Sequence, residues 1–242
     1  MSYRILSGIF FLLISINASA GDDLAPILST DPHRNDLGFF DMHICNWADR
    51  PLFFKSLFST TRFKDIEVMT VYSPAGKKIT DLDMSKFMLI QRKGKPVKKV
   101  FLTDSEIPLD SKAGWYEIKV KTKDGKEYSA KDYVVMNRLS RADVVAPKDG
   151  VEDIVIPKEL TWKPVPGATH YKVFMRDGFE NTRILNSKLI KEPRIALKPG
   201  MLQPGGYYLW KVHARDVNEN IILGDFNSGS VNKWMEFSVI DE

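Results

Sequence analysis

The chain has 242 residues, of which 43% are hydrophobic, 11% aromatic and 27% charged, and its formal net charge is +4. These proportions are typical of a globular protein and exclude a disordered, collagen-like or coiled-coil chain. The charge is too small to indicate binding to nucleic acid. A single cysteine, Cys45, excludes an internal disulfide and a zinc site built from several cysteines.

The first 20 residues have the pattern of a secretory signal peptide. Arg4 supplies the positive charge, Ile9–Ile14 the apolar stretch and Ala18–Ala20 the small-residue cleavage site. This apolar stretch is much shorter than the roughly 20 residues that a membrane-spanning helix needs. The remaining chain has neither a cysteine pair nor an N-x-S/T glycosylation site. We therefore expect cleavage near Ala20, no membrane span, and a bacterial periplasmic or secreted protein.

Two segments follow before the first regular alternation. Gly21–Leu37 begins with acidic residues and contains proline, which favours an extended arm. Asp49 and Pro51 precede apolar residues at helical spacing in Leu52–Phe58, so the spacing allows one short helix near residues 50–59. This apolar segment either closes one end of a β sandwich or forms an exposed surface for a partner.

Most of the chain alternates apolar and polar residues with the period of a β-strand. Ile66–Tyr72 ends in turn residues. Tyr116, Ile118 and Val120 alternate with charged residues, and Asp124–Gly125 supplies the next turn. Many short strands with frequent turns predict an all-β sandwich or barrel.

A basic segment separates two of these predicted strands, Phe87–Gln91 and Val97–Leu102. Contact with lipid headgroups, an acidic polysaccharide or an acidic protein would suit such a patch. We favour a solvated hairpin tip, whose lysines discourage pairing with other strand edges. The patch has five positive charges and no acid: Arg92, Lys93, Lys95, Lys98 and Lys99.

The two halves of the chain share one pattern. Gly114–Val120 and Gly206–Val212 both read glycine, aromatic, tyrosine, any residue, large apolar residue, lysine and valine, with an offset of 92 residues. This offset is close to the roughly 100 residues of one sandwich domain. Tyr116 and Tyr208 are predicted to form tyrosine corners. We expect two tandem β sandwiches, at residues 38–143 and 144–242, after the signal peptide at 1–20 and the arm at 21–37.

The second half carries further motifs at regular spacing. Leu160–Trp162 reads as a strand with a core tryptophan, Tyr171–Val173 as the next strand, and Leu202–Gly205 as the corner before Tyr208. With these motifs, residues 145–239 resemble a fibronectin type III domain, whereas the first half is only generally immunoglobulin-like. The resemblance implies a fold and no activity. Val217–Asn232 is longer than the short hairpin loop that the family usually has at this place. We expect this insertion to be mobile or to contribute to a binding surface.

No catalytic signature is present: the sequence lacks GxSxG, HExxH, phosphate-loop and calcium-loop patterns. Asp41, His43 and Cys45 would share one face of a strand, with successive side chains about 7 Å apart. This spacing is poor for a nucleophile, its base and an orienting acid, so we expect Cys45 to be a buried, inert thiol. The sequence predicts a protein that is not an enzyme and has no cofactor or metal.

Alternation in the second half predicts one outward surface on two neighbouring strands. A surface of basic, aromatic and imidazole groups suits an anionic or glycan partner. It equally suits a solvated sheet whose cationic stems cover stray apolar groups. The two histidines lack the further ligands that zinc requires. The predicted surface consists of His170, Lys172, Phe174, Leu209, Lys211 and His213.

The leading functional prediction is an exported, non-enzymatic binding protein of the bacterial cell envelope that engages a protein partner. A polysaccharide-binding module is the alternative, and an accessory subunit of an enzyme is the third; nucleic acid is not an expected partner. Glycan binding would need exposed aromatic rings beside polar loops. The candidates are Trp47, Trp115, Tyr207, Phe226 and Trp234, with Asp225 and Asn227 of the insertion.

Overall fold

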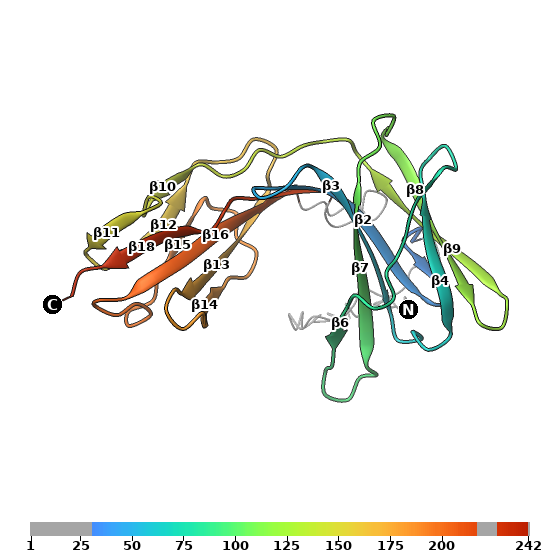
Figure 1. Cartoon of the computed structure of the whole chain (residues 1–242), viewed down its shortest axis with the longest axis horizontal. Helices are drawn as coiled ribbons and strands as arrows, with labels where there is room; N and C mark the ends of the chain where they lie inside the picture. The colour runs from blue at the N-terminus through green and yellow to red at the C-terminus, as the bar shows by residue number, and fades with distance from the viewer. Residues whose placement is uncertain (1–30, 217–226, 242) are drawn as a thin grey trace, which may run out of the picture.

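The structure is a computed structural model that describes residues 31–216 and 227–241. The predicted signal peptide, most of the arm, Asp225 and Phe226 lie outside these residues. The described part of the chain is all-β and contains no helix, and accordingly no described helix could cross a membrane. It forms two immunoglobulin-like β sandwiches that meet at a bend (Figure 1).

In the first sandwich, the sheet β2-β3-β7-β6 packs against the sheet β5-β4-β8-β9, and β1 pairs with β2. Its strands are β1 (Arg34–Asn35), β2 (Gly38–Trp47), β3 (Phe53–Thr60), β4 (Ile66–Tyr72), β5 (Lys78–Asp81), β6 (Phe87–Ile90), β7 (Lys98–Glu106), β8 (Gly114–Thr122) and β9 (Glu127–Val134).

In the second sandwich, the sheet β10-β12-β15 packs against a sheet that contains β14, β13, β16 and β18. A short strand, β11, pairs with β18, and β17 pairs with β16. The strands are β10 (Val144–Ala146), β11 (Val151–Ile154), β12 (Glu159–Trp162), β13 (His170–Asp177), β14 (Arg183–Asn186), β15 (Arg194–Ala196), β16 (Tyr207–Arg215), β17 (Ser228–Val231) and β18 (Met235–Val239).

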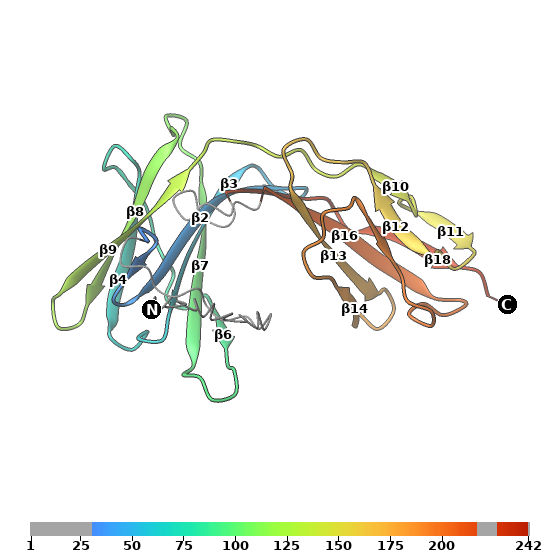
Figure 2. The same ribbon diagram turned by 180° about the vertical axis from the view of Figure 1, so that it is seen from behind.

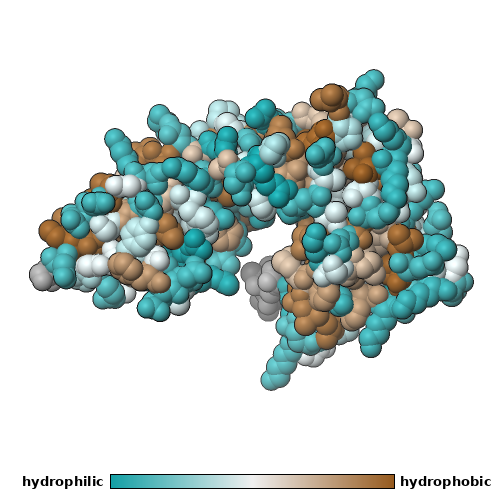
Figure 3. Space-filling view, viewed as in Figure 1, coloured by the Kyte–Doolittle hydropathy of each residue, from teal (hydrophilic) through white to brown (hydrophobic). Residues whose placement is uncertain are grey.

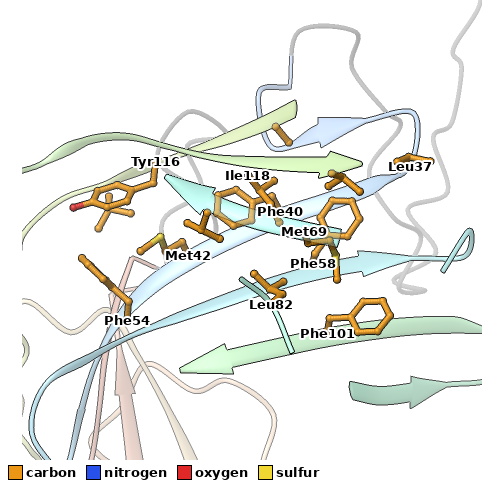
Figure 4. Packing of buried hydrophobic residues seen from close by; sticks show 14 of the residues in the cluster. Leu37, Phe40, Met42, Phe54, Phe58, Met69, Leu82, Phe101, Tyr116 and Ile118 are labelled. Carbon is orange, nitrogen blue, oxygen red and sulfur yellow. The ribbon is translucent and has the colours of Figure 1, made fainter. Parts of the chain in front are cut away.

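The alternation of the sequence places the core residues of the first sandwich as predicted. Tyr116, Ile118 and Val120 on β8 are fully buried. Tyr116 and Ile118 face Phe40 and Phe54 of the opposite sheet (Figure 4). Burying each large apolar side chain contributes about 1.5–3 kcal/mol. The packing of these alternate residues therefore stabilises the sandwich.

Residues 50–59, where the spacing allowed a helix, hold strand β3 instead. This strand lies between β2 and β7 and is hydrogen-bonded to both. Phe54 and Phe58 point into the core with no exposed surface, while Phe53 is buried on the other face against Trp47. Because both faces of β3 are covered at its start, adjacent phenylalanines are buried, and their spacing imitates that of a helix. An exposed partner-binding surface at Leu52–Phe58 is therefore wrong.

Both predicted tyrosine corners are present. The Tyr116 hydroxyl donates to the Lys112 carbonyl at 3.1 Å. In the second sandwich, the Gln203 amide donates to the Tyr208 hydroxyl at 2.7 Å. A Cβ atom at Gly206 would overlap that hydroxyl, so the glycine of the repeated motif is needed for the corner to close.

Strand β17 joins the two sandwiches into one continuous sheet. It pairs antiparallel with β16 and parallel with the end of β2. Residues 228–231 are all buried. The second part of the Val217–Asn232 insertion is therefore a buried strand and not a loop, and residues 217–226 lie outside the described part of the chain.

Polar side chains at this junction bind the backbone between the sandwiches. The Asn46 amide donates to the Leu139 carbonyl at 2.8 Å, and the Ser230 hydroxyl donates to the Ser140 carbonyl at 2.7 Å. Asn227 accepts from the Val135 amide at 2.6 Å and donates to the Val135 carbonyl at 2.9 Å. Each half thus contributes bonds that hold the connecting segment.

Because the sheet is continuous, the outer faces of β2, β17 and β16 form one surface. Seen from either side, the sheets β2-β3-β7-β6 and β14-β13-β16 border the inner side of the bend (Figures 1 and 2). The space-filling view shows the molecule hollowed there (Figure 3). Side chains of both sandwiches therefore meet on the concave side.

Candidate ligand-binding site

The outward surface predicted on the second sandwich exists on β13 and β16. Phe174 lies directly opposite Lys211, and Lys172 directly opposite His213. Phe174, Lys172 and Lys211 are half-buried. His213 is not exposed as expected, since only 9% of its surface is accessible. The reason is that β17 continues the sheet and places Val231 beside it.

A pocket of about 650 Å³ lies over this surface. The second sandwich supplies most of its wall, and Trp47 at the end of β2 adds a side chain from the first. Sequence reasoning found Phe174, Lys211 and His213, and named Trp47 and Trp234 only as separate aromatic candidates. It missed the two asparagines and Arg183, which follow β13 on a turn and on β14. The main lining residues are Trp47, Phe174, Arg176, Asn181, Arg183, Asn186, Lys211 and Trp234.

Aromatic rings hold the cations at the wall of the pocket. The Lys211 ammonium and the Arg176 guanidinium each lie 4.3 Å from the centre of the Trp234 ring. Lys172 and Lys211 lie 5.8 and 5.9 Å from the centre of the Phe174 ring. A cation–π contact contributes about 0.5–2 kcal/mol, depending on how far the cation is desolvated. These contacts restrict where the positive groups can point.

The pocket is rich in hydrogen-bond donors. Arg176 donates through Nη1 to the Asn181 side-chain oxygen at 2.8 Å, but its buried Nε has no acceptor among the described residues. The indole N–H of Trp47 likewise has none there. Across residues 31–216 and 227–241, no carboxylate forms an ion pair with Arg176, Arg183 or Lys211.

The electrostatics of the pocket follow from this arrangement. Burial, then the charge of Arg176, lowers the pKa of Lys211, although Asp49 acts in the opposite sense. Burial, then Arg215, lowers the pKa of Lys172. The pKa of His213 is lowered well below its usual value, first by burial and then by the surrounding cations. The pocket therefore has an excess of positive charge.

Several other predicted residues lie away from the pocket. His170 is half-buried at the far end of β13, where its Nδ1 lies 3.1 Å from the Thr169 hydroxyl. Leu209 is half-buried opposite Arg176. Asn227 is 4% exposed, and its side-chain amide donates to the Val135 carbonyl.

Two of the aromatic candidates also lie outside the pocket. Trp115 is 36% exposed and packs edge-on against Tyr133 in the sheet on the far side of the first sandwich. Tyr207 is half-buried, and its hydroxyl donates to Glu236. Of the rings proposed for glycan binding, only Trp47 and Trp234 line the pocket; Phe226 lies outside the described residues.

The basic patch forms a separate hairpin between β6 and β7. Arg92, Lys93 and Lys95 are exposed at its tip. Lys98 and Lys99 are half-buried, and the Lys99 ammonium lies 3.6 Å from the centre of the Phe87 ring. Burial and the charges of nearby arginines lower the pKa of Lys98. None of these five residues lines the pocket.

The Asp41, His43 and Cys45 side chains share one face of β2, as expected. Cys45 and His43 are buried, with 1% and 5% exposed surface. The His43 Nδ1 lies 3.5 Å from an Asp41 carboxylate oxygen. Burial opposes the charge of His43, but Asp41 outweighs it and raises the pKa to about 9. A histidine that is protonated at neutral pH is not a general base.

Sequence reasoning missed a second buried histidine cluster. His33 lies between Asp31, 2.8 Å from its Nδ1, and Asp132, 3.1 Å from its Nε2. Asp132 also accepts the Met42 amide at 2.7 Å. The contacts join the end of the arm to β2 and β9, and both His33 and Asp132 are 2% exposed. We interpret this cluster as structural. Within the described ranges, no three or more His, Cys, Asp or Glu side chains are grouped to hold a metal ion.

No family model and no curated protein matches the chain. Several solved structures are similar to it at low identity. One is a biofilm-associated protein, BSP domain, with 12% identity, a TM-score of 0.27, and coverage of 83% of this chain and 29% of that chain. Another is SGBP-B of the Bacteroides ovatus mixed-linkage glucan utilization locus, in complex with a heptasaccharide, with 13% identity, a TM-score of 0.23, and coverage of 80% and 42%.

Murine CEACAM1b is a third similar structure, with 9% identity, a TM-score of 0.23, and coverage of 83% of this chain and all of that chain. The chain spans less than half the length of the first two structures. At these scores, the similarities carry no argument about what this chain binds. The properties of the pocket must therefore carry the functional conclusion.

Proposed function

We propose that this chain is an exported, non-enzymatic binding protein of the bacterial cell envelope, periplasmic or secreted, that engages its ligand through the pocket on β13, β14 and β16. The signal-peptide pattern of Met1–Ala20 supports export. The observation that carries the proposal is a concave pocket whose cations rest on aromatic rings and have no carboxylate partner among the described residues.

The architecture around the pocket supports a fibronectin type III-like second domain. Its three-stranded sheet packs against the larger sheet, Trp162 is buried between them, and Tyr208 closes the corner before β16. We keep the domain bounds near residues 38–143 and 144–242, with Leu37 packed in the core of the first sandwich and Leu139 and Ala142 in the core of the second. β17 belongs to the second domain and extends the sheet of the first.

Two partner classes suit an exported binding protein with this pocket. An envelope or secreted protein could insert a side chain into it, and a polysaccharide could lie along it. In the third interpretation, the chain is an accessory subunit of an enzyme, and the same surface positions a substrate.

The pocket volume of about 650 Å³ falls in the 300–1,000 Å³ range that is usual for small-ligand sites.

The test is a pull-down from detergent-free envelope extract with the tagged chain lacking residues 1–20, with analysis of bound proteins and bound sugars. The pocket variant carries Phe174→Ala and Lys211→Gln. The matched control carries Trp115→Ala and Lys119→Gln. These changes remove an aromatic residue and a lysine from β8, in the sheet on the far side of the first sandwich. We expect capture by the wild type and the control and loss in the pocket variant.

Two results would contradict the proposal. Capture that the pocket variant retains in full would move binding away from the pocket. Hydrolytic turnover by the purified chain that is lost on Asp41→Asn or His43→Gln would contradict the non-enzymatic assignment.

A further inference from the structure

We infer that the ligand of the pocket is an acidic polysaccharide whose sugar units carry carboxylates. The inference rests on the proposed function and names the chemical class that the same pocket selects. It depends on three features of the described residues: adjacent cations, aromatic and amide groups beside them, and the position of these groups across the sheet.

The cations of the pocket are placed where they repel one another. Arg176 on β13 lies directly opposite Arg183 on β14, and Lys211 is on the next strand across. Like charges directly opposite each other destabilise a sheet. No carboxylate among the described residues forms an ion pair with these three cations to relieve the repulsion. An anionic ligand would relieve it, and the guanidinium forks of the two arginines match the geometry of a carboxylate.

The uncharged groups of the pocket suit a sugar. Phe174 lies between the cations on the same face of the sheet, where its ring can pack against the apolar face of a pyranose. Asn181 and Asn186 are exposed at the rim of the pocket, and their amides can donate to and accept from hydroxyl groups. Trp47 adds an indole N–H donor without an acceptor in the described part of the chain.

The position of the groups argues against an acidic peptide. An extended peptide would add to the sheet at β14, whose described partner is β13, through backbone hydrogen bonds. A strand added there would lie beyond β14, whereas Lys211 is on β16, on the far side of β13. A ligand that lies across the strands can reach Lys211, Arg176 and Arg183 together. A neutral glycan would leave all three cations unneutralised.

The experiment is isothermal titration calorimetry of the chain lacking residues 1–20 with three probes. The probes are hexagalacturonate, the neutral cellohexaose and a hexaglutamate peptide that is N-acetylated and C-amidated, so that it has the same number of carboxylates as hexagalacturonate. We expect hexagalacturonate to bind at least tenfold more tightly than either of the others. Its affinity should fall as salt is raised, because the contact is partly between charges.

Variants locate the site. Lys211→Gln and Arg176→Gln should each weaken hexagalacturonate binding about tenfold, as expected for the loss of a charged hydrogen bond. Lys211→Arg should retain most of it. Lys119→Gln removes a lysine of β8, in the sheet on the far side of the first sandwich, and should change the affinity for hexagalacturonate less than twofold. Circular dichroism and the melting temperature confirm that each variant is folded.

The outcomes separate this inference from the proposed function. Hexaglutamate binding as tightly as hexagalacturonate, with loss in the Lys211 variant, would overturn the polysaccharide and keep the pocket as a binding site. Equal binding of cellohexaose would overturn the requirement for carboxylates. Absence of hexagalacturonate binding at millimolar concentration would overturn the inference, while the pull-down would still decide the proposed function.

Discussion

Two clusters on the same face of the continuous sheet combine cations with aromatic rings, but only one of them has a carboxylate that pairs with its cations. At the end of β2 and on β3, the Arg50 guanidinium lies 3.4 Å from the centre of the Phe53 ring. Arg50 and Lys55 donate to Asp104, at 2.8 and 2.5 Å. At the pocket, Arg176 and Lys211 lie over Trp234 in a similar way, but no described carboxylate pairs with them.

The two histidines nearest the bend repeat this contrast. Despite burial, Asp41 raises the pKa of His43 to about 9. Burial, followed by Arg215 and other cations, lowers the pKa of His213 well below its usual value. The comparison teaches that the first sandwich neutralises Arg50, Lys55 and His43 with its own carboxylates. The second leaves positive charge available, and a ligand can therefore supply the missing carboxylate.

The largest effect is expected from removing both cations over Trp234. The variant Arg176→Gln/Lys211→Gln should lower the affinity for hexagalacturonate by about a hundredfold, because each charged hydrogen bond contributes about 1.5–3 kcal/mol. The matched variant Arg50→Gln/Lys55→Gln removes the neutralised cluster, which touches the pocket only through the Trp47 ring, and should change the dissociation constant less than about threefold. Calorimetry measures both, and equal losses in the two variants would break the comparison.

A smaller effect should follow from converting the pocket into a neutralised cluster. Asn181→Asp places a carboxylate at the atom that already accepts from Arg176 at 2.8 Å. The internal ion pair would compete with the ligand, and we expect affinity to fall about tenfold. The melting temperature should stay the same or rise. Unchanged affinity with a folded protein would show that Arg176 does not contact the ligand.

The reverse change concerns stability more than binding. Asp104→Asn removes the shared partner of Arg50 and Lys55, which are partly exposed. Partly exposed ion pairs contribute little, so the free energy of unfolding in urea should fall by about 1 kcal/mol or less. The loss should shrink at high salt because exposed charges are screened. A loss of several kcal/mol would mean that this cluster is more than a surface network.

The smallest effect on binding is expected from His43, which does not line the pocket. His43 and His213 are compared instead by their titration. His43 should remain protonated to about pH 9, whereas His213 should stay neutral well below pH 6.5. His43 then contributes stability that is complete below about pH 6.5 and lost as pH rises through about 9. His213 contributes stability above about pH 6.5 that is lost as pH falls towards its lowered pKa.

Side-chain NMR of the histidines checks both directions, and unfolding measured from pH 7 to 9 checks the linkage. The free energy of unfolding should decrease over this interval in the wild type and stay nearly constant in His43→Gln. A His43 that titrates near pH 6 would contradict the role assigned to Asp41.

The features that could be predicted from the sequence are those with a local pattern. The alternation at Tyr116–Val120 and the glycine before Tyr208 predicted the core face and the tyrosine corner, and both are confirmed. The outward surface that Phe174 and Lys211 share followed from alternation on two strands that are neighbours in the fibronectin type III family, whereas their direct pairing is known only from the structure. Such features depend on side-chain period and turn residues, which are visible in a short stretch of sequence.

The features that could not be predicted depend on contacts between distant segments. The sequence of Ser228–Val231 shows no alternation of apolar and polar residues. The strand is nevertheless buried, because its backbone pairs with β2 and β16 and the Ser230 hydroxyl donates to a backbone carbonyl. Only this pairing brings Trp47 of the first sandwich to the pocket. The strand β3 could not be predicted for a similar reason. Phe53 and Phe54 are both buried, on opposite faces of the strand, so the sequence there does not alternate between apolar and polar residues.

The most direct test of the account is an NMR titration of the ¹⁵N-labelled chain with hexagalacturonate, which observes both clusters in one experiment. We predict chemical-shift changes centred on Phe174, Arg176 and Lys211, with none of comparable size at Arg50 and Lys55. The same titration with cellohexaose should leave the spectrum unchanged. Changes centred on the Arg50 cluster or on the hairpin between β6 and β7 would contradict the claim that the pocket of the second sandwich is the ligand site.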